Sequence, residues 1–179
     1  MSSITITEAL AELKTIGKRL EKKHQFVQDY LMRPEHIRDP LEKEGGSPQS
    51  VTREMQSIHD LNERTLSIRR AVQLANERNT ILVGNETRSI SDWLVWQREI
   101  APTRQRFLAA LRQKIDGQRT STMQRGGALA IAGSETKAGD VVVNISELDL
   151  AKDIEQLEYV LGYLDGQLSL KNATVVIDV

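Results

Sequence analysis

Apolar residues recur every three or four positions along four stretches of the chain, and this spacing predicts amphipathic helices. The predicted helices span residues 5–32, 48–79, 90–116 and 147–171. Thr5 followed by Glu8 forms a capping box at the start of the first helix. Ser47 and Pro48 predict the start of the second, as an N-cap residue with proline at the first helical position. The chain is therefore predicted to be mainly helical.

The fourth predicted helix has the most regular apolar seam, with residues spaced alternately by four and three. The seam consists of Leu150, Ile154, Leu157, Leu161, Leu164 and Leu168. This heptad spacing is typical of helices that pack side by side. Leu157 and Leu161 lie in the middle of the seam, and we expect both to contact a packing partner, within the chain or in a second copy.

A short β-hairpin is predicted over residues 80–88, between the second and third helices. Ile81 and Val83 lie on one face of its first strand. Gly84 and Asn85 supply two turn residues that tolerate positive φ. A β-hairpin is more than two helices need for their connection, so we expect it to have a role of its own.

Two roles are predicted for the hairpin, and they are compatible. It covers the ends of the two long helices, with Ile81 packed near Trp93. It also presents a strand edge to which a partner's strand can add, and the outward residues Glu86 and Arg88 then contact that partner. Trp93 and Trp96 are the only tryptophans; they are predicted core anchors of the helical hairpin or, alternatively, contacts for a partner.

Proline interrupts the third predicted helix. Pro102 removes a helical hydrogen bond, so a kink or a break is expected near Glu99 to Ala101.

The chain is predicted to divide into a helical bundle over residues 1–117 and a second part over 118–179. The second part begins with an irregular segment and continues as strand, helix and strand, with the strands over 141–145 and 173–178. Their pairing stays open. The candidate partners are the other strand of the pair, a possible strand at Ala128–Ala132, and a neighbouring subunit.

These elements predict a mainly α fold: a long antiparallel helical hairpin or coiled-coil bundle with a small β element near the C-terminus. Four apolar seams exceed what one slim bundle needs, and an excess seam is normally buried by copies of the same chain. A homo-oligomer is therefore predicted.

Composition narrows the classes of function. The 179 residues include no cysteine, which excludes disulfides and thiolate metal sites. No window approaches the roughly 18 apolar residues that span a bilayer, and the N-terminus lacks the pattern of a signal peptide. A net charge of −1 gives no general attraction to nucleic acid or to an acidic membrane. We expect the chain to be made and folded in the cytosol.

Charge is balanced overall but unevenly placed. Residues 98–125 contain seven basic and two acidic side chains, whereas residues 135–179 contain nine acidic and three basic ones. The two segments are predicted to pack against one another, within the chain or between copies. The alternative is that the basic segment contacts nucleic-acid phosphates. Its candidate residues are Arg104, Arg106, Arg112, Lys114, Arg119 and Arg125. This segment has no known nucleic-acid-binding motif and almost no aromatic residues for base stacking.

No catalytic, cofactor or metal site is predicted. His24, His36 and His59 lie on different elements without a carboxylate at ligand spacing, so structural or solvated histidines are expected. The glycine-rich stretch at residues 125–133 lacks the Gly-Lys-Ser/Thr ending of a phosphate-binding loop.

The chain around the predicted hairpin resembles a known family. The residues that carry the resemblance are Ala75-Asn76, Asn79-Thr80, Gly84, the run TRSISDWL and Arg98. Over about residues 50–115 this pattern resembles the helical-hairpin core of the septicolysin-like proteins. The resemblance implies an all-helical hairpin of a kind common in bacterial and phage genomes, without an assigned activity.

The leading hypothesis is a non-enzymatic structural or assembly protein of a phage virion, such as a minor capsid, neck or tail-associated component, made in the host cytoplasm. Its expected partners are copies of itself and other proteins of the assembly, with no cofactor and no membrane. The alternative is a small cytosolic phage-encoded binder or inhibitor. Its site would lie at a subunit interface, lined by Trp93, Trp96 and the arginines of the third helix.

Overall fold

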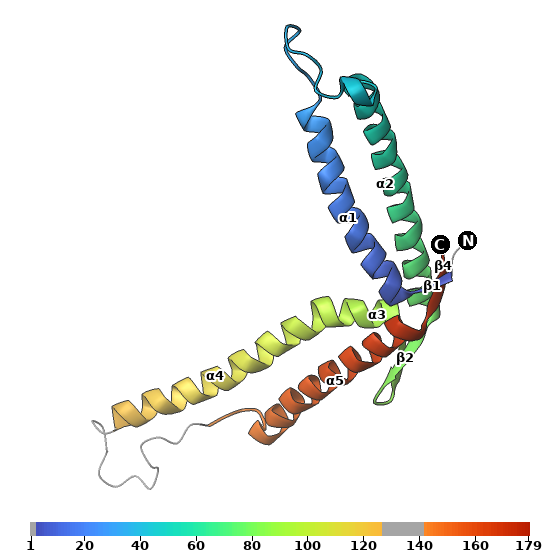
Figure 1. The fold of residues 1–179 in the computed structure, drawn as a ribbon. Helices are drawn as coiled ribbons and strands as arrows, with labels where there is room; N and C mark the ends of the chain where they lie inside the picture. Colours follow the sequence, from blue (N-terminus) through green and yellow to red (C-terminus); the bar gives the residue numbers. More distant parts are fainter. Residues whose placement is uncertain (1–2, 127–141) are drawn as a thin grey trace, which may run out of the picture. The chain divides into compact units, whose positions relative to one another are not determined.

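The computed structural model describes residues 3–126 and 142–179, and the fold is mainly α, as predicted (Figure 1). The chain forms two compact units. Unit 1 consists of the residues up to Asn79 together with Leu168–Val179, and unit 2 consists of Thr80–Gln167. The elements are β1 (Ser3–Thr5), α1 (Ile6–Asp29), the 3-10 helix η1 (Glu42–Glu44), α2 (Ser47–Arg78), β2 (Thr80–Val83), β3 (Glu86–Ser89), α3 (Ile90–Val95), the π-helical turn η2 (Trp96–Ile100), α4 (Ala101–Gly126), α5 (Glu147–Thr174) and β4 (Val176–Asp178).

Helices α1 and α2 of unit 1 form an antiparallel hairpin. The Lys23 ammonium lies 2.6 Å from a carboxylate oxygen of Glu54, and the Arg64 guanidinium lies 2.8 Å from one of Glu12. Later residues of α1 thus pair with earlier residues of α2, which is the order that antiparallel helices require. The buried core between them consists of Ile6, Ala9, Ile16, Ile68, Ala75 and Ile177.

Side-chain caps fix the start of each helix in this hairpin. The predicted capping box is confirmed: the N–H of Glu8 donates to the Thr5 hydroxyl at 3.2 Å, and the N–H of Thr5 donates to the Glu8 carboxylate at 2.7 Å. Helix α2 differs from its prediction. Gly46 is the N-cap residue and Ser47 is the first helical residue. The cap comes from Asp39, eight residues before Ser47 in the sequence: its carboxylate accepts hydrogen bonds from the N–H and the hydroxyl of Ser47 at 2.8 and 2.6 Å.

The Asp39 cap makes the stability of unit 1 depend on pH. Hydrogen bonds from the Ser47 hydroxyl and N–H, and then from the Leu41 N–H, hold the pKa of Asp39 below its usual value. A lowered pKa in the folded state means that the ionised carboxylate stabilises the fold above about pH 4, and that this stabilisation is lost as the pH falls through the folded pKa. Asp39→Asn should therefore lower the Tm at neutral pH. Thermal melts at decreasing pH should show the difference from wild type shrinking; a constant difference would contradict this account.

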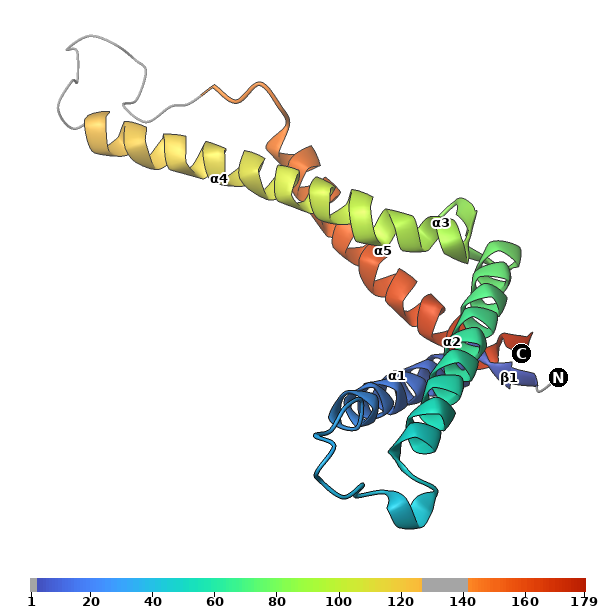
Figure 2. The same cartoon turned by 90° about the horizontal axis from the view of Figure 1, so that it is seen from above.

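Strands β1 and β4 join the two ends of the described chain. They run antiparallel and lie side by side (Figure 2). The Cα partners are Ser3–Asp178, Ile4–Ile177 and Thr5–Val176. Beyond them, the N–H of Ile6 donates to the carbonyl of Val175 at 3.1 Å. The partner of the C-terminal strand is thus none of the three considered from the sequence. It is β1 because this pairing places Ile177, which is 6% exposed, over the unit 1 core.

A strand was predicted over residues 141–145. The structure describes residues 142–145 of this segment, and they do not form a strand, so the prediction is wrong there. Val142 is 89% exposed. Residues with branched side chains form a strand only where a neighbouring strand pairs with their backbone, and none of the described strands pairs with this segment. Residue 141 and the proposed partner Ala128–Ala132 lie outside the described residues.

Pro102 is accommodated by a π-helical turn rather than by a break. Elements α3, η2 and α4 follow one another without interruption, and the N–H of Ala101 donates to the carbonyl of Trp96, five residues earlier. Proline offers no N–H to the carbonyl of Arg98, and its ring crowds that carbonyl in an ordinary helix. The wider turn just before Pro102 relieves this conflict, so the irregularity lies at the predicted place.

Helices α4 and α5 pack antiparallel along a shared apolar seam in unit 2. The seam consists of the buried Ala101, Leu108, Leu150 and Leu157 and the half-buried Trp96, Leu111, Ile115, Ile154 and Leu161. Arg119 forms an ion pair with Glu147, and the Arg104 guanidinium lies 3.7 Å from the Asp153 carboxylate. The described part of the basic segment therefore packs against the acidic helix within the chain.

The observed units differ from the predicted division after residue 117. Helix α5 shares a core with α4, and β4 pairs with β1, so the predicted second part contributes to both units. A seam in the sequence shows that a helix has an apolar face; it does not show which helix covers that face.

Candidate interaction site

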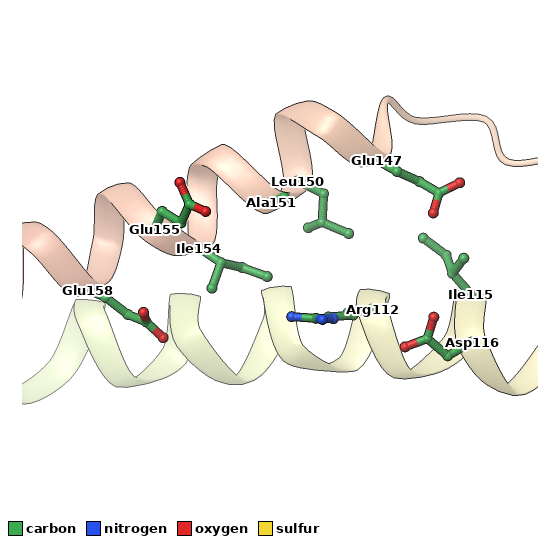
Figure 3. Close-up of a pocket in the computed structure, with 9 residues that line it drawn as sticks. All are labelled: Arg112, Ile115, Asp116, Glu147, Leu150, Ala151, Ile154, Glu155 and Glu158. Atoms are coloured by element: carbon green, nitrogen blue, oxygen red, sulfur yellow. The ribbon is translucent and has the colours of Figure 1, made fainter.

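A groove lies along one side of the α4–α5 pair in unit 2, with a volume of about 460 Å³. It is lined by Arg112, Ile115 and Asp116 of α4 and by Glu147, Leu150, Ala151, Ile154, Glu155 and Glu158 of α5 (Figure 3). Every lining residue belongs to unit 2, so the groove is a feature of this unit alone.

The floor of the groove is the edge of the unit 2 core. Leu150 is 8% exposed, and Ile115 and Ile154 beside it are half-buried. In α5, Glu147, Ala151 and Glu155 follow one another at intervals of four and therefore lie on one edge of the helix, next to the seam. The sequence thus places two carboxylates, those of Glu147 and Glu155, on the edge of the helix next to the apolar seam.

Charged side chains of both signs surround this floor. Figure 3 shows the Arg112 side chain along α4, with Glu155 and Glu158 toward one end of the groove and Asp116 and Glu147 toward the other. Glu147 is already paired with Arg119. The side chains of Arg112, Glu155 and Glu158 form no hydrogen bond or ion pair with any other residue that the structure describes.

An apolar floor with unpaired charges at its rim suits the docking of a protein helix. The apolar contact excludes water, and ion pairs at the rim fix the partner and its register. Of the charged groove residues, only Arg112 is predicted from the sequence to bind anything, as a candidate phosphate contact; Leu150 and Ile154 are predicted as seam residues. The sequence also carried a signal for Glu158, which directly follows Leu157 of the predicted seam at a position where coiled coils carry their pairing charges.

The residues predicted in the β-hairpin are largely internal. Ile81 and Val83 are 2% and 4% exposed, whereas Leu82 between them is 56% exposed. The indole N–H of Trp93 donates to the carbonyl of Ile81 at 3.0 Å, so the predicted packing of Ile81 near Trp93 is confirmed. Only Gly84 of the two turn residues has a positive φ, +59°, which is the arrangement of a type II′ turn.

Glu86 and Arg88 lie on β3 and pair with each other. The Arg88 guanidinium also lies 5.1 Å from the centre of the Trp93 ring, a cation–π arrangement. The ring of the half-buried Trp96 meets that of Trp93 edge to face at 5.6 Å. These side chains therefore hold the hairpin against α3; contact with a partner at Glu86 and Arg88 stays a prediction.

Leu157 and Leu161 lie in the α4–α5 seam, as expected of residues in mid-seam. Leu157 is 4% exposed and Leu161 is half-buried. Together with Ile81, Val83 and Trp93, Leu157 is thus buried within unit 2, which leaves these four residues almost no surface for a partner.

Neither a metal site nor a membrane-spanning helix is found among the described residues. No group of three or more His, Cys, Asp or Glu side chains is placed to hold a metal ion in the part of the chain that the structure describes. Within the same residues, no helix has the length and apolar character to cross a membrane.

Comparison with known proteins bears on the fold. No model of a protein family matches the chain, and no curated protein does either. Among solved structures, the chain is similar to the crystal structure of a functionally unknown conserved protein from Corynebacterium diphtheriae, with a TM-score of 0.50 and 15% sequence identity. The match covers 99% of this chain and 100% of that one. At such low identity the likeness concerns the fold alone: this chain has, over nearly its whole length, a fold similar to that of the Corynebacterium protein.

Proposed function

We propose that the chain is a non-enzymatic structural protein that acts through contacts with copies of itself and with other proteins of a larger assembly. One observation carries the proposal: the helices of unit 2 expose large apolar side chains outside their shared seam. These are Ile100, Phe107, Leu148, Tyr159 and Tyr163, which are 51%, 60%, 65%, 61% and 40% exposed. Exposed aromatic and aliphatic residues gathered on helices are typical of surfaces that bind other proteins.

The tyrosines add a specific feature to this surface. The rings of Tyr159 and Tyr163 stack at 6.1 Å, one helical turn apart. Neighbouring glycines, Gly162 and Gly166, meet no atom within 4 Å at the place where a Cβ would lie, so nothing in the described chain requires them to be glycine. Each costs the helix about 1 kcal/mol relative to alanine. Glycines at these two positions would allow a partner helix to approach α5 closely beside the tyrosines.

Unit 1 offers a second apolar surface. Leu66 and Leu74 of α2 and Val176 of β4 are 53%, 43% and 57% exposed. Leu74 lines two adjoining shallow grooves, one shared with Leu66 and the other with Val176. A chain with apolar surfaces on both units is suited to contacts with several neighbours at once.

We propose that the assembly is a phage virion. Long helices with a second apolar face suit lateral packing in a capsid, neck or tail structure. The alternative is a cytosolic binder with a site lined by Trp93, Trp96 and the arginines of the third predicted helix. The burial of Trp93, which is 3% exposed and whose indole N–H already donates to Ile81, argues against such a site.

The test is the mass of the protein in solution. Sedimentation at micromolar concentration should give a mass above the 20.2 kDa of one chain. Phe107→Ser combined with Tyr159→Ser should lower that mass, with the helix content and Tm unchanged, because both side chains are exposed. Proteomics of purified phage particles checks the virion role. A monomeric wild type that is missing from every particle would contradict the proposal.

A further inference from the structure

The groove of unit 2 carries an excess of negative charge. Its only cation is Arg112, and its four carboxylates are those of Asp116, Glu147, Glu155 and Glu158. Arg119, which does not line the groove, pairs with Glu147. The other three carboxylates form no ion pair with any residue that the structure describes. A fitting occupant of the groove therefore brings positive charge.

The floor of the groove calls for an apolar contact as well. Leu150 is 8% exposed there, and Ile115 and Ile154 beside it are half-buried. The lining residues of α5 extend from Glu147 to Glu158, which is about three helical turns or roughly 16 Å. This length suits one short amphipathic helix that lies along the groove with its apolar face on the floor.

Unit 2 already shows how α5 receives a helix of this kind. Helix α4 contains six basic residues and one acidic residue, and its apolar side covers the seam of α5. Its Arg119 pairs with Glu147, and its Arg104 guanidinium lies 3.7 Å from the Asp153 carboxylate. The groove offers the same combination of apolar floor and carboxylates next to this interface. A second basic helix placed there would extend the α4–α5 pair into a three-helix arrangement.

We infer that the groove binds a basic amphipathic helix of another protein of the assembly, whose lysines or arginines pair with Glu155 and Glu158. This inference rests on the part of the proposed function that concerns other proteins, and it names the chemistry of one such partner. A second copy of the same groove is a poor occupant, because it would bring carboxylates against carboxylates.

The experiment titrates the full chain against a fluorescein-labelled peptide of two LKKLLKL heptads and measures the dissociation constant by fluorescence anisotropy. As a helix, this probe has leucine on one face and lysine on the other. The wild type should bind it in the micromolar range. A peptide of LEELLEL heptads should bind about tenfold more weakly, because its carboxylates meet those of the groove. Equal affinity for the two peptides would overturn the inference.

Groove variants test where the lysine peptide binds. Glu155→Gln combined with Glu158→Gln should weaken its binding about tenfold, because two ion pairs at the rim are lost. Arg112→Gln removes the only cation of the lining and should strengthen binding about threefold. Glutamine is a good helix former, so the three substitutions should leave α4 and α5 intact. An affinity that neither variant changes would overturn the assignment of the peptide to the groove.

Two matched controls lie outside the groove lining. Asp149→Asn combined with Glu99→Gln removes the same two charges from exposed residues and should leave the dissociation constant unchanged. Phe107→Ser combined with Tyr159→Ser removes exposed apolar side chains and should also bind the peptide as the wild type does. Loss of binding in either control would place the peptide elsewhere on unit 2 and overturn the inference. Far-UV circular dichroism verifies that each variant is folded.

Sedimentation of the same proteins separates this inference from the proposed function. A wild type that forms oligomers but does not bind the lysine peptide overturns this inference alone. An oligomer mass that falls when Glu155 and Glu158 are replaced assigns the groove to a second copy and also overturns it. A monomeric wild type that binds the peptide supports this inference and contradicts the self-association in the proposed function.

Discussion

Replacing Leu157 with aspartate should unfold unit 2. Leu157 is 4% exposed and lies in the middle of the α4–α5 seam. Truncating a buried leucine to alanine costs about 2–5 kcal/mol, and an unpaired buried carboxylate adds several more. Because whole domains are stable by only about 5–15 kcal/mol, the native state should no longer be populated. Trp93 and Trp96 both lie in unit 2, so their fluorescence during urea titration reports the loss.

The neighbouring seam residue Leu161 is the matched control. It lies one turn further along α5 but is only half-buried, so its aspartate can reach water. Leu161→Asp should therefore lower the urea midpoint less than Leu157→Asp does. Equal effects would show that burial in this seam does not set the cost, and a wild-type midpoint for Leu157→Asp would show that the seam is not a packing surface.

The second large effect is expected at Trp93. This side chain is 3% exposed, and its indole N–H satisfies the carbonyl of Ile81 in the hairpin. Trp93→Ala should lower the free energy of unfolding by about 3–5 kcal/mol, because it opens a cavity and leaves a backbone acceptor without its donor. The Arg88 guanidinium also loses the ring face above which it lies. Urea denaturation followed by far-UV circular dichroism measures the change.

Trp93→Phe separates the two causes. Phenylalanine keeps most of the apolar volume but offers no N–H, so the loss should be closer to the roughly 1 kcal/mol of one hydrogen bond, with some cost for the smaller ring. If alanine and phenylalanine give the same loss, the hydrogen bond to Ile81 sets the whole cost, and packing of the Trp93 ring contributes little. A larger loss for alanine than for phenylalanine would show that the packed Trp93 ring also holds the hairpin against the start of α3.

Local patterns in the sequence were sufficient for most of the helices. The capping box at Thr5 and Glu8 needs only residues three apart, and the periodic seams need only one helix at a time. Pro102 predicted an irregularity at the right place because its steric conflict is local. The form of that irregularity, a π turn at Trp96–Ile100, depends on how the whole helix packs and was not predictable.

Local sequence patterns could not predict contacts between residues that are far apart in the chain. The segments Ser3–Thr5 and Val176–Asp178 are each too short to be recognised as a pair without the fold that brings them together. At residues 141–145 the composition predicted a strand that is not observed in the described residues 142–145, because none of the described strands pairs with them. In the groove, the charges of Arg112 and Glu155 were plain in the sequence, but their place along one groove follows only from the packing of α4 on α5.

The pairing of β1 with β4 has a consequence for synthesis. A ribosome makes Ser3–Thr5 first among these elements and Val176–Asp178 last, so β1 emerges without its partner strand and Ile6 without the carbonyl that its N–H contacts. The unit 1 core stays open at Ile177 for the same period. Closing a loop of that length during translation is slow, and the waiting strand is open to wrong partners. Unit 1 therefore completes its fold only after the whole of unit 2 has been translated.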